Sequence, residues 1–222
     1  MKARGYSHSV IGGREVNQDS FLVDEEKGLF AVADGVGGGL KGEVASRLAI
    51  EGFQKFAPQS GSLKPAIDQT QEIILKEAIE TLGEAVMGTT LTGVRLKEGV
   101  VSLIHIGDSH CYLVQDGVLR LMNQDHESFD EVVGGTVLMS YLGLPPDLAK
   151  LTIQEEAFPI LPGQSLLLCS DGLYRQLDET RMGVLIRENA QTPQQLVEKL
   201  CEEASANEYS DNITVVFVTI SP

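Results

Sequence analysis

The middle of the chain is a run of short strand-like segments joined by tight turns, and this run limits the fold more than any other feature. The segments are "TTLTGVRL", "GVVSLIHIG", "HCYLVQ" and "VLRLM". Glu98-Gly99 and Asp116-Gly117 lie between them, and glycine in such a pair supplies the positive φ that a two-residue hairpin turn needs. The run therefore predicts successive antiparallel hairpins rather than βαβ units.

Helices are expected in two pairs, one on each side of this run. Apolar residues recur at helical spacing in 44–56 and in 67–82, and again around 178–188 and 193–206. Further strands are expected near both ends, in "SHSVI", "SFLVDE", "GLFAVAD", "LTIQEEAF", "SLLLCSD" and "NITVVFVTI". Antiparallel sheets with segregated helices predict an α+β fold, a four-layer α-β-β-α sandwich with two sheets face to face and a helix pair outside each.

The length and the absence of repeats or long linkers favour a single domain over residues 1–222. Residues 124–150 are expected to be irregular or weakly helical, because Gly134-Gly135 and Pro145-Pro146 interrupt them.

The charge balance argues against some classes of partner. Lys and Arg total 17 and Asp and Glu total 32, which gives a formal charge of −15. Such a chain repels nucleic-acid phosphates and anionic lipid, so we expect no nucleic-acid or membrane partner. No secretory signal or membrane-length apolar run is recognisable. Three cysteines without a CxxC pair indicate reduced thiols and a cytoplasmic location.

Five aspartates stand at the ends of expected strands. Asp34, Asp108 and Asp171 each follow an apolar run and precede a small residue, Asp211 precedes the last strand, and Asp19 precedes "SFLV". One such aspartate is usually a turn former, but five are harder to explain in that way. Carboxylates without a His or Cys cluster suit Mg²⁺ or Mn²⁺, whereas zinc would favour nitrogen or sulfur ligands.

An ordered series of motifs makes the chain resemble a known family. "REVNQDS", "VADGVGGGLKGEVAS", "MGTT", "HIGDSHCYLV", "QDHES", "LLLCSDGLY" and "DNITVVFV" run from Arg14 to Val218. In this order they resemble the metal-dependent protein phosphatases of the type 2C kind, in particular their compact bacterial branch. Each motif is weak alone, and the seven in order form a strong signal.

The resemblance implies the same sandwich and a site with two Mn²⁺ or Mg²⁺ ions, with a third ion left open. It assigns Asp34 to both metals, Asp171 and Asp211 to the first, and the Gly35 carbonyl and Asp19 to the second. It assigns Asp108 with Asp171 to the third metal of bacterial relatives, and Arg14 to the substrate phosphate. Asp34, Asp171 and Arg14 are thus the expected catalytic residues.

The implied activity is that of a protein serine/threonine phosphatase, which hydrolyses phosphoserine and phosphothreonine with a metal-activated water. The implied partners are a phosphorylated protein substrate and a cognate bacterial serine/threonine kinase, and the implied state is a monomer. The resemblance also makes 124–150 a short flap. The general acid stays open between a metal-bound water and His126, because Val36 and Gly39 stand where relatives carry histidines.

Two alternatives belong to other functional classes. A catalytically weak phosphatase-like protein could bind a phosphoprotein as a regulator, although retention of all five aspartates speaks against it. A nucleotide site on Gly37, Gly38 and Gly39 would need a third glycine where Leu40 stands, or Ser or Thr after Lys41. Neither pattern is met.

Overall fold

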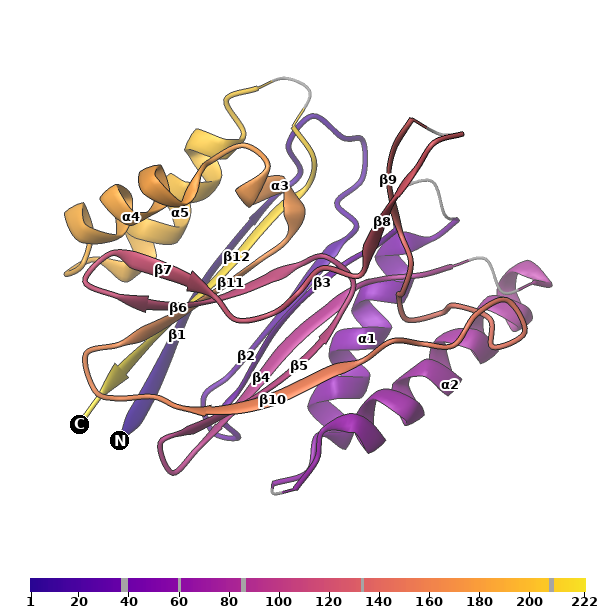
Figure 1. Cartoon of the computed structure of the whole chain (residues 1–222), viewed down its shortest axis with the longest axis horizontal. Helices are drawn as coiled ribbons and strands as arrows, with labels where there is room; N and C mark the ends of the chain where they lie inside the picture. Colours follow the sequence, from indigo (N-terminus) through magenta and orange to yellow (C-terminus); the bar gives the residue numbers. More distant parts are fainter. Residues whose placement is uncertain (37–39, 60, 85–86, 133, 208–209) are drawn as a thin grey trace.

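Two antiparallel five-stranded sheets packed face to face form the centre of the molecule (Figure 1). The structure is a computed structural model, and it describes residues 1–36, 40–59, 61–84, 87–132, 134–207 and 210–222. The first sheet has the order β1 (Lys2–Val10), β12 (Ile213–Ser221), β11 (Ser165–Cys169), β6 (His110–Gln115) and β7 (Val118–Leu121). The second has the order β10 (Gln154–Pro159), β5 (Val100–Ile106), β4 (Leu91–Lys97), β3 (Leu29–Asp34) and β2 (Asp19–Asp24).

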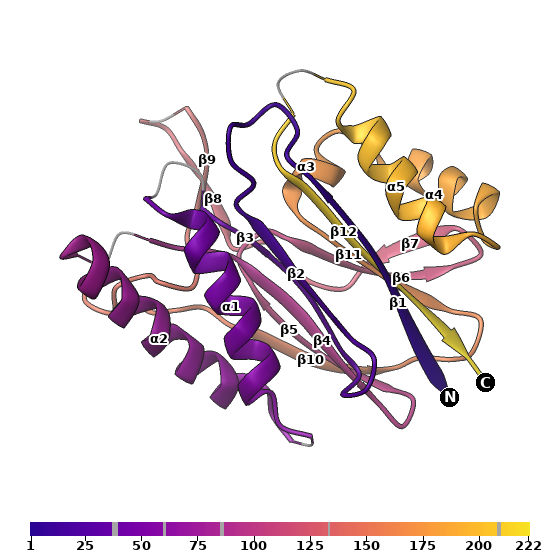
Figure 2. The same cartoon turned by 180° about the vertical axis from the view of Figure 1, so that it is seen from behind.

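Helices cover the outer face of each sheet, as Figures 1 and 2 show from opposite sides. The helices α1 (Gly42–Phe56) and α2 (Lys64–Leu82) lie over the second sheet, and α4 (Glu179–Glu188) and α5 (Pro193–Ala204) lie over the first. A short helix, α3 (Asp171–Tyr174), follows β11 directly. The predicted α+β fold with its four layers is therefore confirmed.

The strands alternate between two apolar interfaces, which explains why they read as nearly continuous apolar runs. Phe30 and Val32 of β3 face the other sheet, whereas the intervening Ala31 packs with the α1–α2 pair. In β12, Val216 and Val218 lie between the sheets, and the residues between and before them pack against α4 and α5. Each buried aliphatic side chain contributes about 1.5–3 kcal/mol, so both faces of each sheet stabilise the sandwich.

The two predicted hairpin turns are confirmed. Glu98 and Gly99 have φ of 52° and 79°, and Asp116 and Gly117 have φ of 53° and 73°. Positive φ at both central positions is the pattern of a type I′ turn, whose twist matches that of the strands that it joins.

Residues 124–150 match the prediction only in part, because most of the described residues are irregular but a pair of strands was not expected. They contain a two-stranded hairpin, β8 (Glu127–Asp130) and β9 (Gly135–Leu138), with Glu127 opposite Leu138. Both strands have four residues and are only partly buried or exposed. They therefore lack the apolar alternation by which a half-buried strand is recognised.

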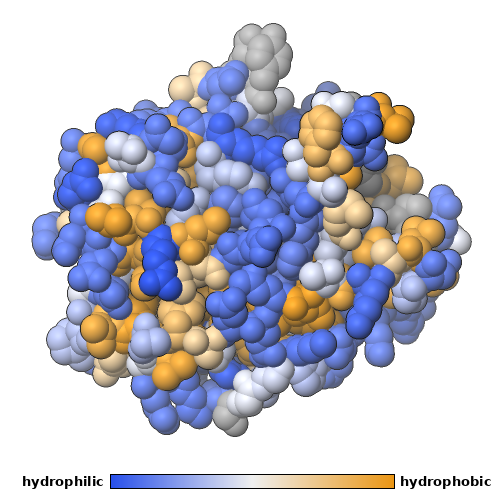
Figure 3. Space-filling model, viewed as in Figure 1, coloured by the Kyte–Doolittle hydropathy of each residue, from blue (hydrophilic) through white to orange (hydrophobic). Residues whose placement is uncertain are grey.

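The surface is uneven in polarity on the face that Figure 3 shows. Hydrophobic residues gather on the side where β6 and β7 lie, and Val118 and Leu121 of β7 are exposed. The upper part of this view, between α3 and the β8–β9 hairpin, is mostly hydrophilic. Polar chemistry is therefore expected at that end of the sandwich.

A close backbone approach lies at this end of the sandwich, just after β3. A Cβ added to Gly35 would stand 2.5 Å from the backbone carbonyl carbon and oxygen of Gly42, the first residue of α1. Gly37, Gly38 and Gly39, on which the alternative of a nucleotide site depends, lie outside the described residues. The glycines at 35 and 42 have a definite role, because they let α1 begin directly against the end of β3.

We expect Gly35→Ala to destabilise the protein by about 1–3 kcal/mol, because the new methyl group overlaps backbone atoms that cannot move away freely. Urea unfolding measures the change. Gly135→Ala is the matched control, since a Cβ there meets no described atom within 4 Å. Equal stabilities of the two variants would contradict the packing argument.

Candidate metal centre

Two of the five aspartates face each other across the β2–β3 pair. Asp19 is the first residue of β2, Asp34 is the last residue of β3, and the register places them directly opposite. Directly opposed side chains in an antiparallel pair share one face of the sheet, and two like charges there repel each other. A bound cation, or a proton on one of the two carboxylates, would therefore relieve this repulsion.

The other three aspartates come from the ends of strands in both sheets. Asp171 begins α3 immediately after β11, Asp211 precedes β12, and Asp108 follows β5. The hydroxyl of Ser170 donates a hydrogen bond of 2.7 Å to Asp19 Oδ2 and so joins the two sheets at this end. The predicted strand ends therefore meet where the sheets meet.

These strand ends surround one cavity of about 350 Å³. Its lining includes the predicted site residues Arg14, Asp34, Gly35, Asp108, Asp171 and Asp211. Asp19 is not part of this lining, but it stands directly opposite Asp34, and the charges of Asp19 and Asp171 both act on the Asp34 carboxyl. The structure thus places the predicted site residues other than Asp19 around one cavity, with Asp19 beside it through its pairing with Asp34.

Burial dominates the electrostatics of the cluster. Removal from water raises the pKa of the Asp34 carboxyl well above its ordinary value, and the nearby carboxylates, Asp19 first, raise it further. Burial likewise raises the pKa of Asp19 to about 6 and that of Asp108 to about 7. The pKa of Asp171 is raised for the same reason, although Arg175 opposes the shift. In each case burial is the largest cause of the raised pKa, and neighbouring carboxylates add to it.

The donor atoms fit a hard divalent cation. Asp19 Oδ1 and Asp171 Oδ1 are buried and receive no hydrogen bond from the described part of the chain, and carboxylate oxygens are the ligands that Mg²⁺ and Mn²⁺ prefer. The side chains do not surround a single point, since no three Asp, Glu, His or Cys among the described residues form a ready-made ion site. Arg14 pairs with Asp211, and Arg175 pairs with both Asp108 and Asp171.

Sequence reasoning missed Arg175 and Glu127, which also line the cavity. Arg175 Nη2 donates to Glu127 Oε1 at 2.9 Å, and its Nε lies 3.0 Å from Asp171 Oδ2. The spacing of four between Asp171 and Arg175 was the available signal, because such residues are neighbours on a helix. Glu127 carried no comparable signal.

Asn212 fixes the loop that carries Arg14. Its side-chain amide donates to the carbonyls of Ile11 and Val16 at 2.8 and 3.0 Å, and its Oδ1 accepts from the backbone N–H of Gln18 at 2.8 Å. The neighbouring Asp211 accepts from Arg14. One buried amide therefore orients the loop against the strand end.

The histidines lie beside the cluster rather than in it. His105 is fully buried, bonds to Thr92 at 2.8 Å, and has its pKa lowered to about 3 by burial. His126 accepts a hydrogen bond from the N–H of Gly107 at its Nδ1, 3.2 Å away, and ties the base of the β8–β9 hairpin to the β5–β6 turn. It is not among the described residues that line the cavity.

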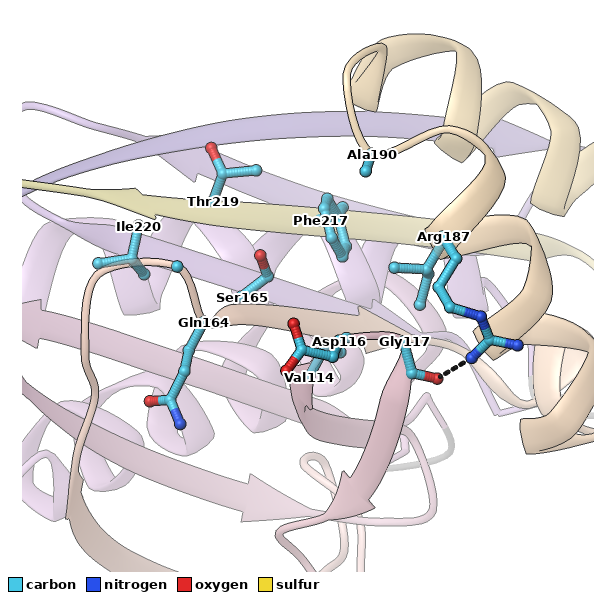
Figure 4. Close-up of a pocket in the computed structure, with 12 residues that line it drawn as sticks. Val114, Asp116, Gly117, Gln164, Ser165, Arg187, Ala190, Phe217, Thr219 and Ile220 are labelled. Atoms are coloured by element: carbon cyan, nitrogen blue, oxygen red, sulfur yellow. Dashed lines mark hydrogen bonds between the residues drawn. The ribbon is translucent and has the colours of Figure 1, made fainter.

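A second cavity, of about 430 Å³, lies between α4 and strands β6, β11 and β12 (Figure 4). Val114 and Phe217 line it, and its charged residues are Asp116 and Arg187. Arg187 donates to the carbonyl of Gly117 at 3.3 Å. None of the five aspartates belongs to this larger cavity, so the chemistry is assigned to the smaller and more polar one.

Known proteins resemble this chain over nearly its whole length. A family model described as "Stage II sporulation protein E (SpoIIE)" matches residues 24–221. The "Serine/threonine phosphatase stp" of Listeria monocytogenes is 27% identical over 92% of this chain and 90% of that protein.

Solved structures agree with this match. The structure of PppA from Pseudomonas aeruginosa has a TM-score of 0.86 and 30% identity, and covers 99% of this chain and 98% of that one. The catalytic domain of the serine/threonine phosphatase PstP, solved with two manganese ions, has a TM-score of 0.81 and 27% identity, with coverages of 100% and 99%. Of the helices described in the present chain, none has the length and apolarity needed to cross a bilayer.

We expect the metal-free protein to lose stability as the pH rises from 5 to 8. The folded pKa values of Asp19 and Asp108, about 6 and about 7, exceed the ordinary aspartate value of 3.8, so the folded state holds protons that the unfolded chain has released. Their stabilising effect is complete below pH 3.8 and is lost as the pH passes through 6 to 7. The melting temperature should fall by roughly 5 °C or more.

Calorimetry in a chelating buffer measures this fall. In buffer without chelator, Mn²⁺ should make the fall in melting temperature smaller, because bound cations take the place of the protons. In the metal-free protein, Asp34→Asn should also make this fall smaller, because it removes a negative charge from the cluster. A melting temperature that is constant or rises between pH 5 and 8 would contradict the raised pKa values of Asp19 and Asp108.

Proposed function

Because this chain belongs to the metal-dependent bacterial serine/threonine phosphatases that match the SpoIIE model, we propose that its carboxylate cavity is where it hydrolyses phosphoserine and phosphothreonine in proteins. The observation that carries this proposal is the convergence of Asp34, Asp108, Asp171 and Asp211 on one polar cavity from ends of both sheets. A phosphorylated side chain of a protein substrate can reach such an open edge.

The ligand assignment is the one that the family resemblance implies, and carboxylate and carbonyl oxygens fit it. Asp34 stands opposite Asp19 and interacts electrostatically with Asp19 and Asp171, so it is suited to hold two cations at once. Asp171 and Asp211 would complete the first position, and Asp19 with the Gly35 carbonyl the second. Two Mn²⁺ or Mg²⁺ ions would supply Lewis acidity and lower the pKa of the water that attacks phosphorus. The two manganese ions of the PstP catalytic domain support this number.

Arg14 is the residue that would bind the phosphate. Its guanidinium lines the cavity and pairs with Asp211, with side-chain exposures of 55% and 38%. An exposed ion pair is worth about 0–1 kcal/mol, so a phosphate dianion competes well for the guanidinium. The planar fork of arginine can then donate two hydrogen bonds to phosphate oxygens.

The wider assignment is a single catalytic domain over residues 1–222 with residues 124–150 as its flap. We infer a monomer that acts in the cytoplasm against the products of a cognate serine/threonine kinase. The three cysteines support this location, because all of them are free and buried.

We expect hydrolysis of a phosphothreonine peptide to require Mn²⁺ or Mg²⁺, and Asp34→Ala and Asp171→Ala to lower kcat at least about 100-fold, because each removes a ligand of the metal pair. Phosphate release is the measurement. Asp68→Ala, on the exposed side of α2, is the control and should retain full activity. Activity that survives chelation or both substitutions would refute the mechanism. Peptide binding without turnover would indicate the regulatory alternative.

We expect Arg14→Lys to raise KM for the phosphopeptide about 10- to 100-fold, because a charge-assisted bidentate contact is replaced by a single point charge. The change in kcat should be smaller. Initial-rate kinetics at saturating Mn²⁺ separate the two parameters. An unchanged KM would show that Arg14 does not bind the phosphate.

A further inference from the structure

Arg175 joins three carboxylates that come from separate parts of the chain. Its Nε lies 3.0 Å from Asp171 Oδ2, and its Nη2 lies 3.2 Å from Asp108 Oδ2 and 2.9 Å from Glu127 Oε1. These partners belong to α3, to the turn after β5, and to β8. A single guanidinium thus connects both sheets and the flap at one side of the cavity.

The surroundings hold this guanidinium in place. The hydroxyl of Tyr174 donates to the carbonyl of Asp108 at 3.1 Å, and the ring of Tyr174 stacks on that of His110 with centroids 3.7 Å apart. His110 in turn bonds to Asp125 through its Nε2, at 3.0 Å. Arg175 lies 5.9 Å from the centroid of the Tyr174 ring. The side chains beside the carboxylates therefore hold one another in fixed positions.

The contacts of Asp171 divide its two oxygens. Oδ2 is engaged by Arg175, whereas Oδ1 is buried and receives no hydrogen bond from the described residues. One oxygen thus remains for the metal pair of the proposed function. The guanidinium holds Asp171 Oδ2 and Asp108 Oδ2, so these two oxygens are not free for a further ion between the two side chains.

We propose that Arg175 is a built-in counter-ion for Asp108, Asp171 and Glu127 and that it excludes a third divalent cation from this side of the cavity. The inference rests on the metal pair of the proposed function. A divalent ion and a guanidinium cannot share these oxygens, because they would repel each other at contact distance. The position that the family resemblance assigns to a third ion is filled here by a side chain.

The consequence is a site whose cation number is fixed by the chain. Arg175 is tethered four residues from Asp171, so its local concentration does not depend on the concentration of metal in solution. Arg175 also positions Asp171, because it binds Oδ2 and leaves Oδ1 without a hydrogen bond from the described residues. Neutralising residue 175 should therefore expose a new ion site rather than simply weaken the old ones.

The test counts bound Mn²⁺ by equilibrium dialysis at increasing Mn²⁺, with metal and protein measured in the same sample. We expect Arg175→Gln, which keeps much of the length of the side chain without its charge, to bind one more ion per chain than the unmodified protein. Arg175→Ala serves as a second variant, and circular dichroism verifies that each variant is folded. Adding Asp108→Ala to Arg175→Gln should remove the extra ion.

Arg181→Gln is the matched control. Arg181 pairs with Glu203 on the exposed surface of α4 and α5, away from the cavity, so its loss should not change the count. Equal counts for folded Arg175 variants and the unmodified protein would overturn the inference, whether the shared number is two or three. A count of zero in all of them would overturn the metal pair as well, so the two failures are distinguishable.

Discussion

The opposition of Asp19 and Asp34 across two paired strands is the constraint on which the rest of the site depends. Two carboxylates on one face of a sheet, largely removed from water and joined there by Asp171, have to be compensated by cations or protons. The hydrophobic packing of the two sheets enforces this proximity, because the strands that carry the aspartates continue into the core. The favourable free energy of packing the two sheets thereby offsets the repulsion among these carboxylates, which would separate if they were free in water.

The two arginines at the cavity meet this demand in different ways. Arg14 is held by one exposed carboxylate and is therefore free to exchange partners. Arg175 is held by three carboxylates from three segments, all of them mostly buried. A guanidinium that is held by one exposed carboxylate can leave it to bind a substrate phosphate. A guanidinium that is held by three carboxylates stays in place and stabilises the wall of the cavity. Arginine therefore has two roles in this cavity: Arg14 can exchange its partner, and Arg175 keeps its partners.

Much of this arrangement was accessible from sequence, and the exceptions have physical causes. Helix faces depend on local periodicity and hairpin turns on local Gly pairs, and they were placed correctly on this basis. The strand-end aspartates were visible one by one, but only the family resemblance implied that they act together. The β8–β9 hairpin was missed because its strands bury too little to leave a pattern. Arg175 was missed because its meaning depends on Glu127, which is distant in sequence and is brought near by that hairpin.

The pairing of β1 with β12 joins residue 2 to residue 221 and completes the first sheet. The strand ends before Arg14 and after Asp211 are therefore anchored by contacts of the largest sequence separation in the molecule. Such contacts form late in folding, because the entropy of closing so long a loop has to be offset first. During synthesis, a nascent chain that still lacks β12 has no complete cavity. A chain that ends with α5 lacks both Asp211 and Asn212 of the cavity lining and the strand that pairs with β1.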